Sequence, residues 1–129
     1  MQNFREFDAG PDPFGVTWHV RFKWLQTAIS IRHSNSVDAK FILDSGTAIQ
    51  EKTISLPYPE LLEVSNQSGT PMTDAWCTRL AMLHLEYLVA SGEDMEKDLV
   101  TVSAKEMMAY SARIRNWEVE EVRRIRGAA

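Results

Sequence analysis

Cys77 and His84 are the two residues of this chain whose types and spacing come closest to a chemical site. They stand seven residues apart, so both would lie on one face of a helix, where a thiolate and an imidazole can bind a metal ion or form a nucleophilic pair. A structural zinc site needs two more ligands, and only His19 and His33 could supply further imidazoles. A buried thiol beside a histidine at the helix edge is the simpler interpretation. We therefore predict no metal and no cofactor.

A second candidate site consists of Asp94, Glu96 and Asp98, whose alternate spacing is that of the first ligands of a calcium-binding loop. The position at which such a loop requires glycine is Leu99, and its twelfth position is Lys105. The motif therefore fails, and we interpret this stretch as an acidic, solvated loop.

A third candidate is a group of basic residues on predicted strands. If the aromatic residues of the first strand face the helices, the opposite face carries His19, Arg21, Lys23, Arg32 and Lys40. Closely spaced positive groups hold phosphates or carboxylates, so this face could bind an anionic ligand, an acidic partner or single-stranded nucleic acid. Alternating strands also carry such residues simply on their solvent side, and we expect no exposed aromatic residue there to stack on bases.

Motifs of known catalytic chemistry are missing from the sequence. It has no glycine-rich phosphate loop, nucleophile elbow, histidine-rich zinc helix or dinucleotide fingerprint. No pair of acidic residues is placed by local spacing in an apolar pocket, where one pKa could be raised for acid–base work. The catalytic residues, if the chain has any, are unknown from the sequence, and we lean toward a protein that is not an enzyme.

Length and composition indicate one soluble domain. The chain has 129 residues, of which 44% are hydrophobic, and that is enough to close a single core. It contains no apolar run of the length that a membrane span requires, and residues 1–8 lack the order of a signal peptide. The single cysteine cannot form an internal disulfide. We therefore expect a cytoplasmic protein without membrane contact.

The charge distribution is uneven. The formal net charge is −4, which argues against general nucleic-acid binding because such binding needs a basic surface. Residues 1–56 hold six basic and six acidic side chains, whereas residues 57–129 hold eight basic and twelve acidic ones. The acidity therefore belongs to the second half of the chain.

Twofold alternation of apolar residues predicts strands in the first half. Residues 1–15 contain glycine and proline and read as a flexible N-terminal arm, pinned by Phe4, Phe7 or Phe14. Residues 16–24 alternate most cleanly, and the apolar positions then change phase, so we expect a reversal or bulge at residues 25–28 and a further strand containing Ile29 and Ile31. Two more strands follow over residues 37–43 and up to Leu56.

The second half reads as two capped helices. Thr70 and Pro71 are typical of a helix start, the helix extends over residues 71–91, and Ser103 with Glu106 forms a capping box that opens a helix over residues 104–126. Residues 57–64 suggest a short helical turn, and residues 99–102 suggest a strand that could join a sheet edge.

These elements predict an α+β fold: an antiparallel four- to five-stranded meander sheet with one long helix packed across a face and a second C-terminal helix. Residues 16–117 would form a single α+β domain. Residues 118–129 would be a charged C-terminal helix end that protrudes, because the apolar phase changes after Trp117 to Val119, Val122 and Ile125.

Our leading hypothesis is a non-enzymatic interaction or regulatory module that forms a homo-oligomer through the C-terminal helix, with Trp117, Val119, Val122 and Ile125 at the interface. A tail packed on its own core is an equally weighted interpretation. The first alternative function is a small-molecule-binding domain or enzyme with a pocket between sheet and helices, which would use His19, His33 or His84. The second is an anion or nucleic-acid binder on the basic sheet face.

Overall fold

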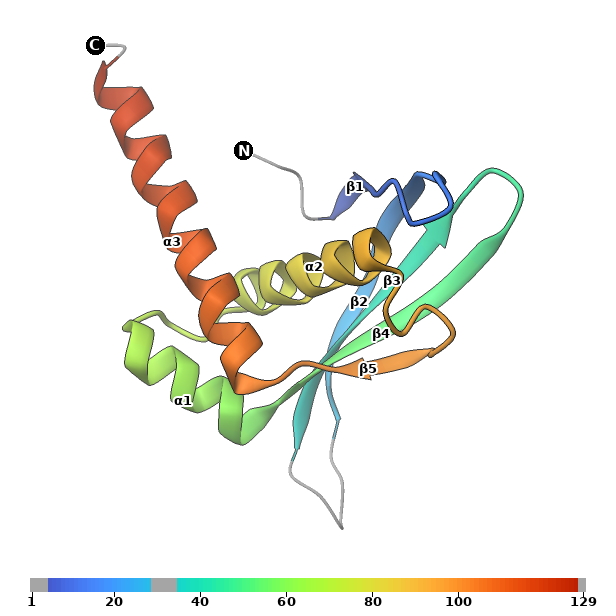
Figure 1. Cartoon of the computed structure of the whole chain (residues 1–129). Helices are drawn as coiled ribbons and strands as arrows, with labels where there is room; N and C mark the ends of the chain where they lie inside the picture. The colour runs from blue at the N-terminus through green and yellow to red at the C-terminus, as the bar shows by residue number, and fades with distance from the viewer. Residues whose placement is uncertain (1–4, 29–34, 128–129) are drawn as a thin grey trace.

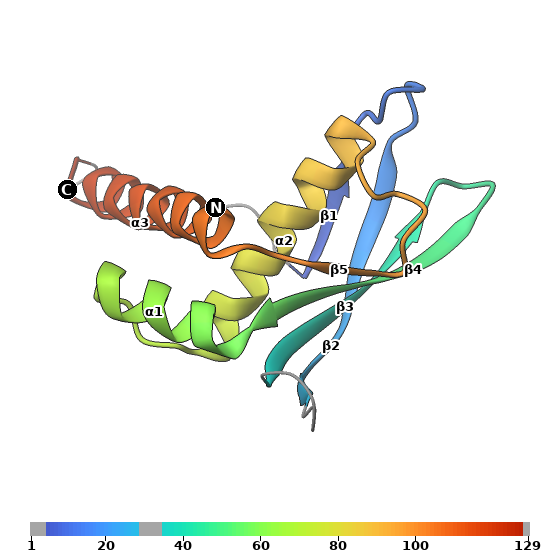
Figure 2. The same cartoon turned by 60° about the horizontal axis from the view of Figure 1, so that its bottom comes forward.

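A single five-stranded sheet with all helices on one side is the framework of the molecule (Figures 1 and 2). The structure is a computed structural model and describes residues 5–28 and 35–127. Within these residues the elements are β1 (Glu6–Ala9), β2 (Trp18–Ala28), β3 (Ser36–Asp44), β4 (Ile49–Pro57), α1 (Tyr58–Ser68), α2 (Asp74–Ser91), β5 (Leu99–Thr101) and α3 (Ala104–Gly127). The predicted α+β class is confirmed.

The sheet has the strand order β1-β2-β3-β4-β5, and its first four strands are antiparallel neighbours. The meander prediction is therefore right for these four strands and wrong for β5, which pairs with β4 in parallel. The chain leaves β4 through α1 and α2 before it returns, and such a long crossover lets the next strand run in the same direction. Residues 99–101 thus join the sheet edge as expected.

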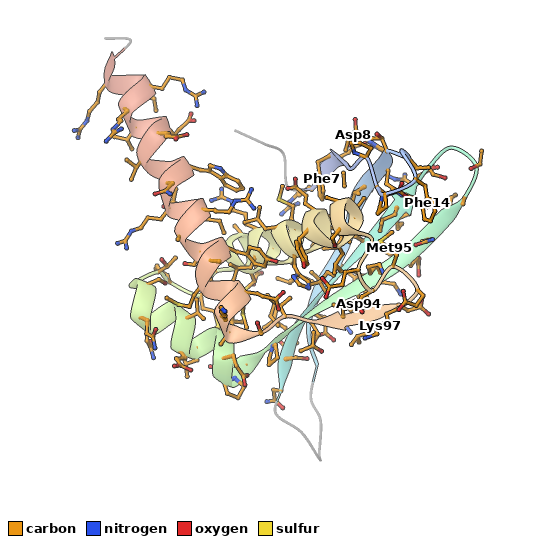
Figure 3. All side chains as sticks on the ribbon, viewed as in Figure 1. Phe7, Asp8, Phe14, Asp94, Met95 and Lys97 are labelled. Carbon is orange, nitrogen blue, oxygen red and sulfur yellow. The ribbon has the colours of Figure 1, made fainter. Side chains whose placement is uncertain are left out.

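The first strand lies inside the segment that we expected to be a flexible arm. Residues 6–9 pair with β2 and bury Phe7 and Ala9 against the core, so the prediction of an unstructured arm is wrong for them. Of the candidate anchors, Phe7 is buried, whereas Phe14 is 91% exposed (Figure 3). Phe4 lies outside the described residues. Alternation over only four residues is too short a pattern to predict a strand.

A β-bulge in β2 changes which side chains face the helices. Phe22 pairs with Phe41, but Trp24 pairs with Lys40, so one residue is inserted between them and the phase changes. Trp24 therefore lies on the face opposite Phe41, contrary to the prediction that it faces the helices. The bulge lies earlier than residues 25–28, and β2 runs on to Ala28 instead of ending at Trp24. The predicted strand with Ile29 and Ile31 falls outside the described residues.

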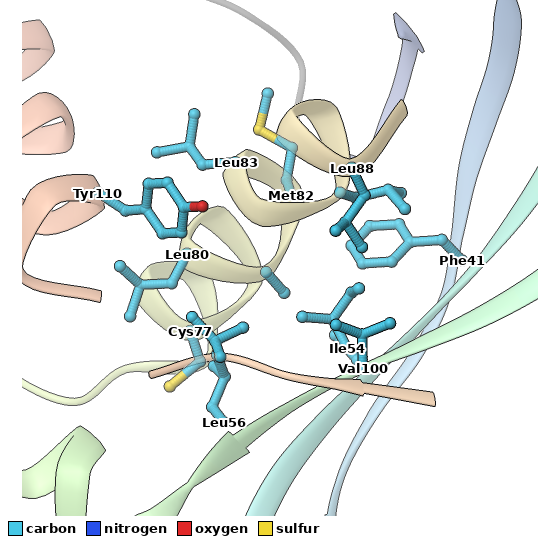
Figure 4. Packing of buried hydrophobic residues seen from close by; sticks show 14 of the residues in the cluster. Phe41, Ile54, Leu56, Cys77, Leu80, Met82, Leu83, Leu88, Val100 and Tyr110 are labelled. Atoms are coloured by element: carbon cyan, nitrogen blue, oxygen red, sulfur yellow. The ribbon is translucent and has the colours of Figure 1, made fainter. Parts of the chain in front are cut away.

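Helix α2 lies across the inner face of the sheet and supplies more of the described core than any other single element (Figure 4). Its N-cap is Thr73, whose Oγ1 accepts a hydrogen bond from the backbone amide of Trp76 at 3.2 Å, so the helix begins three residues later than predicted. Gly92 ends it in the left-handed conformation at φ 75°. The fully buried side chains from sheet and helix include Phe41, Leu43, Ile54, Leu56, Leu80, Met82, Leu83 and Leu88.

Helices α1 and α3 complete the inner layer. Residues 58–68 form three turns of helix rather than the short turn that we predicted. The capping box of α3 is confirmed, because the Ser103 amide donates to Glu106 Oε1 at 3.1 Å and the Glu106 amide donates to Ser103 Oγ at 3.2 Å. Helix α3 buries Met107, Tyr110 and Ile114 and then extends away from the rest of the molecule (Figure 1).

Candidate functional site

His19 lies on the open face of the sheet between two carboxylates. Its Nε2 is 2.8 Å from Glu6 Oε1, and its Nδ1 is 2.9 Å from Asp8 Oδ1. Hydrogen bonds to Asp8 and then to Glu6 raise the pKa of His19 above its ordinary value. Both acids belong to β1, which the sequence did not predict as a strand. The local positive charge expected at His19 is therefore offset by its neighbours.

Two lysines of the predicted basic face share one carboxylate. Lys23 Nζ is 2.8 Å from Glu51 Oε1, and Lys40 Nζ is 3.0 Å from Glu51 Oε2. These hydrogen bonds hold the pKa of Glu51 below its ordinary value. Lys40 also lies over the ring of Trp24, at 5.6 Å from its centroid, an aromatic contact that the expected strand phase excluded.

Arg21 is exposed on the same open face, beside the cross-strand residues Glu6 and Ile42. Arg32 lies outside the described residues. The structure thus brings His19, Arg21, Lys23 and Lys40 to one face but interleaves them with acidic side chains. The acidic side chains offset part of the positive charge that anion or nucleic-acid binding requires.

The imidazole of His84 lies between α2 and α3. Its Nδ1 is 2.8 Å from Tyr110 Oη and 3.6 Å from Glu106 Oε2, and only 3% of the residue is exposed. Burial lowers the pKa of His84, although Glu106 and Glu93 act in the opposite direction. Tyr87 stacks on the imidazole with 6.0 Å between ring centroids. His84 therefore joins α2 to α3.

Cys77 and His84 do not form a joint site. Cys77 lies beside Leu56 at the sheet side of α2, whereas His84 bonds to Tyr110 of α3 (Figure 4). Burial raises the pKa of the Cys77 thiol to about 11, so the thiolate form is scarce at neutral pH. The simpler interpretation, a buried thiol, is what the structure shows.

Lys52 is a core lysine that the sequence pattern did not lead us to expect. It pairs with Phe41 on the inner face, is 1% exposed, and donates from Nζ to the carbonyl oxygens of Asp94 at 2.9 Å and Met95 at 3.3 Å, and also to that of Lys97. Burial lowers the pKa of Lys52. Its ammonium group holds the acidic loop between α2 and β5, where Asp94, Met95 and Lys97 lie (Figure 3). The sequence does contain a signal for the burial of Lys52. Alternation along the strand places it on the same face as Ile54 and Leu56.

A hollow of about 300 Å³ opens between the start of α2 and the middle of α3. Its polar lining includes Thr73, Arg79, Ser111, Arg115 and Glu118, and its apolar lining includes Pro71, Trp76 and Ile114. We call this the Trp76 hollow. Sequence reasoning placed none of these residues in a site, because the hollow joins segments that are more than 30 residues apart along the chain.

Trp76 carries the one unusual feature of this hollow. The residue is 4% exposed, and its Nε1 is buried with no hydrogen-bond partner among the described residues. A buried donor left without an acceptor costs about 1 to 3 kcal/mol, and native proteins contain few of them. Across the hollow, Arg79 Nη1 is 3.6 Å from Glu118 Oε1.

The end of α3 presents the apolar stripe predicted from the phase change. Val119, Val122 and Ile125 are 47%, 48% and 66% exposed. Trp117 differs from them, because it is partly buried, packs against the core and carries the Arg113 guanidinium at 5.6 Å from its ring centroid. Trp117 therefore belongs to the body of the molecule, and the exposed stripe begins after it.

No helix within the described ranges has the length and apolar character needed to cross a membrane. Over the same part of the chain, no group of three or more histidine, cysteine, aspartate or glutamate side chains is arranged to hold a metal ion. Neither a protein-family model, nor a curated protein sequence, nor a solved structure matches this chain.

Proposed function

We propose that this protein is a non-enzymatic interaction module that pairs with a second copy of itself through the end of α3. The contact face consists of Glu118, Val119, Val122, Ile125 and Arg126, and we call it the α3 face. These residues share one side of the helix, because they stand one, four, seven and eight positions after the first. The exposed stripe of Val119, Val122 and Ile125 gains free energy when an apolar surface covers it.

The charges on the α3 face favour a second copy that runs in the opposite direction. Glu118 stands at one end of the face, Arg126 at the other, and Val122 midway between them. In an antiparallel pair centred on Val122, Glu118 of each copy reaches the level of Arg126 in the other. A parallel pair would instead bring like charges to the same level, which is destabilising.

The charges of residues 118–126 as a whole also favour an antiparallel pair. Three glutamates precede Val122 and three arginines follow it: Glu118, Glu120, Glu121, Arg123, Arg124 and Arg126. An antiparallel pair therefore lays an acidic turn beside a basic turn. Arg124 contacts Glu121 of its own helix at 3.3 Å, but an exposed ion pair contributes less than about 1 kcal/mol and can exchange partners.

The expected affinity is modest. A stable interface buries about 800 Å² on each partner, more than one short helical segment supplies. We therefore expect a dissociation constant in the micromolar range, which rises with salt because part of the attraction is between exposed charges.

Sedimentation velocity of the full chain, from about 10 to 500 μM, tests the proposal across the micromolar range. The wild type should shift from monomer to dimer, and Val122→Glu should stay monomeric because it places two like charges at the centre of the contact. Ala112→Glu is the matched control, since it adds the same charge to an exposed position of α3 outside the α3 face. A wild type that is monomeric throughout, or dimers unaffected by Val122→Glu, would overturn the proposal.

A further inference from the structure

The lining of the Trp76 hollow contains more positive than negative side chains. Arg79 and Arg115 contribute two guanidinium groups, and Glu118 contributes the one carboxylate of the lining. The hollow therefore carries a formal charge of +1 in a protein whose net charge is −4. The start of α2 adds its positive dipole end at Thr73 and Ala75.

Trp76, a wall residue of the hollow, contains a buried donor that has no acceptor within the described residues. The Trp76 indole Nε1 is buried without a hydrogen-bond partner, in a residue that forms part of the wall. Because this Nε1 has almost no accessible surface, a ligand in the hollow would contact the apolar ring of Trp76 and not this donor. Apolar atoms of Trp76, Ile114 and Pro71 form the remaining wall and suit a small hydrocarbon group.

We propose that the Trp76 hollow binds a small organic anion, in which a carboxylate or phosphate group contacts Arg79 and Arg115 while its apolar part lies against Trp76 and Ile114. The volume of about 300 Å³ is at the lower end for ligand pockets, so the ligand is the size of a single ring with its charged group. Guanidinium groups bind both kinds of oxyanion in the same planar geometry. This site shares Glu118 with the α3 face and otherwise consists of different residues.

The bound anion competes with a group of the protein itself. Glu118 contacts Arg79 at 3.6 Å and is 62% exposed at its side chain, so it can turn toward solvent when another oxyanion takes its place. Glu118 thus acts as an internal competitor for the site, and its removal should strengthen binding.

An NMR titration of the full ¹⁵N-labelled chain with benzoate and with phenyl phosphate tests this site, and the two arms distinguish carboxylate from phosphate recognition. The four tryptophan indole signals are resolved from the backbone, and Trp76→Phe assigns the one that matters. At least one probe should shift the Trp76 signal saturably, with a dissociation constant of about 1 mM or tighter. Benzamide, the neutral counterpart of benzoate, should not.

Arg79→Gln and Arg115→Gln should each weaken the binding of that probe by about tenfold, because each removes a charged donor. Arg113→Gln is the matched control, since it removes an arginine of α3 that lies over Trp117 and does not line the hollow. The same spectra show whether each variant is folded. The site is excluded if neither probe shifts the Trp76 signal, or if the shifts persist unchanged in both hollow variants. The NMR titration measures ligand binding, whereas sedimentation measures dimer formation. A failure of one proposal can therefore be distinguished from a failure of the other.

Discussion

The Nζ atom of Lys52 lies 2.9 Å from the backbone oxygen of Asp94, although the two residues are 42 positions apart in sequence. This contact joins the central part of β4 to the loop that leads from α2 into β5. The charges of Asp94, Glu96 and Asp98 in this loop favour a nearby cation, and Lys52 of β4 supplies it. A side chain of the sheet therefore fixes the position of this loop.

Lys52→Met should lower the free energy of unfolding by about 2 to 4 kcal/mol, because it leaves three carbonyl oxygens without their charged donor. Chemical denaturation measures the loss, and hydrogen exchange should rise first in residues 94–98. Lys97→Met is the control: that side chain is 58% exposed, so its replacement should change stability by less than about 0.5 kcal/mol. Equal losses in the two variants would contradict the assigned role of Lys52.

His19 should stabilise the fold most at acidic pH. Its folded-state pKa is raised above 6.5 by Asp8 and Glu6, so its contribution is fully present below that value and is lost as the pH rises through the raised pKa. Imidazole NMR signals followed against pH give this pKa directly. Asp8→Asn should bring it back toward 6.5, whereas Asp44→Asn, at the cross-strand neighbour of His19 on β3, should move it less. An unchanged value in Asp8→Asn would refute Asp8 as the main cause of the raised pKa.

His84 should have the opposite pH dependence. Burial depresses its folded-state pKa below 6.5, so its neutral form contributes stability above pH 6.5, which is lost as the pH falls. The titratable groups that act on it or contact it are Tyr87, Glu93, Asp94, Glu106 and Tyr110. Thermal melts between about pH 5 and 8 should therefore lose part of their acid sensitivity in His84→Gln.

Tyr110→Phe should lower the free energy of unfolding by about 1 to 2 kcal/mol. It removes the hydroxyl that is 2.8 Å from His84 Nδ1 but keeps the ring. Denaturation at neutral pH measures the loss. Tyr58→Phe, at an exposed tyrosine on α1, is the matched control and should have a negligible effect. A loss in the control as large as that in Tyr110→Phe would mean that the His84 bond contributes nothing specific.

Exchange of the charges at the two ends of the α3 face should reveal its direction. Glu118→Arg alone and Arg126→Glu alone should each weaken pairing severalfold, because each creates like charges at one level of the antiparallel pair. The double variant restores opposite charges and should recover most of the affinity. Sedimentation velocity at low salt measures all three. The antiparallel contact would be excluded if the double variant lost as much pairing affinity as the two single variants together.

Glu118→Gln should separate the two proposals. It removes the internal competitor of Arg79, so binding of the effective anionic probe should tighten severalfold, while pairing should weaken because Arg126 of the second copy loses its partner. NMR titration and sedimentation measure the two effects separately. Weaker anion binding in this variant would mean that Glu118 supports the hollow instead of competing for it.

Local patterns in the sequence determined the elements that depend on neighbours along the chain. The capping box of Ser103 and Glu106 set the start of α3, Gly92 set the end of α2, and alternation identified β3 and most of β4. The exposed stripe of Val119, Val122 and Ile125 followed from the phase change after Trp117. These features need only dihedral preferences and a hydrophobic period, which the sequence states directly.

Contacts between distant segments were decided by the tertiary structure alone. The bulge near Lys23 turned Trp24 to the open face, β1 brought Glu6 and Asp8 to His19, and Lys52 found its carbonyl partners only across the chain. The Trp76 hollow likewise exists only where α2 meets α3. Period and propensity carry no information on which carboxylate meets which cation, because that pairing depends on register, and one inserted residue in a strand reverses it.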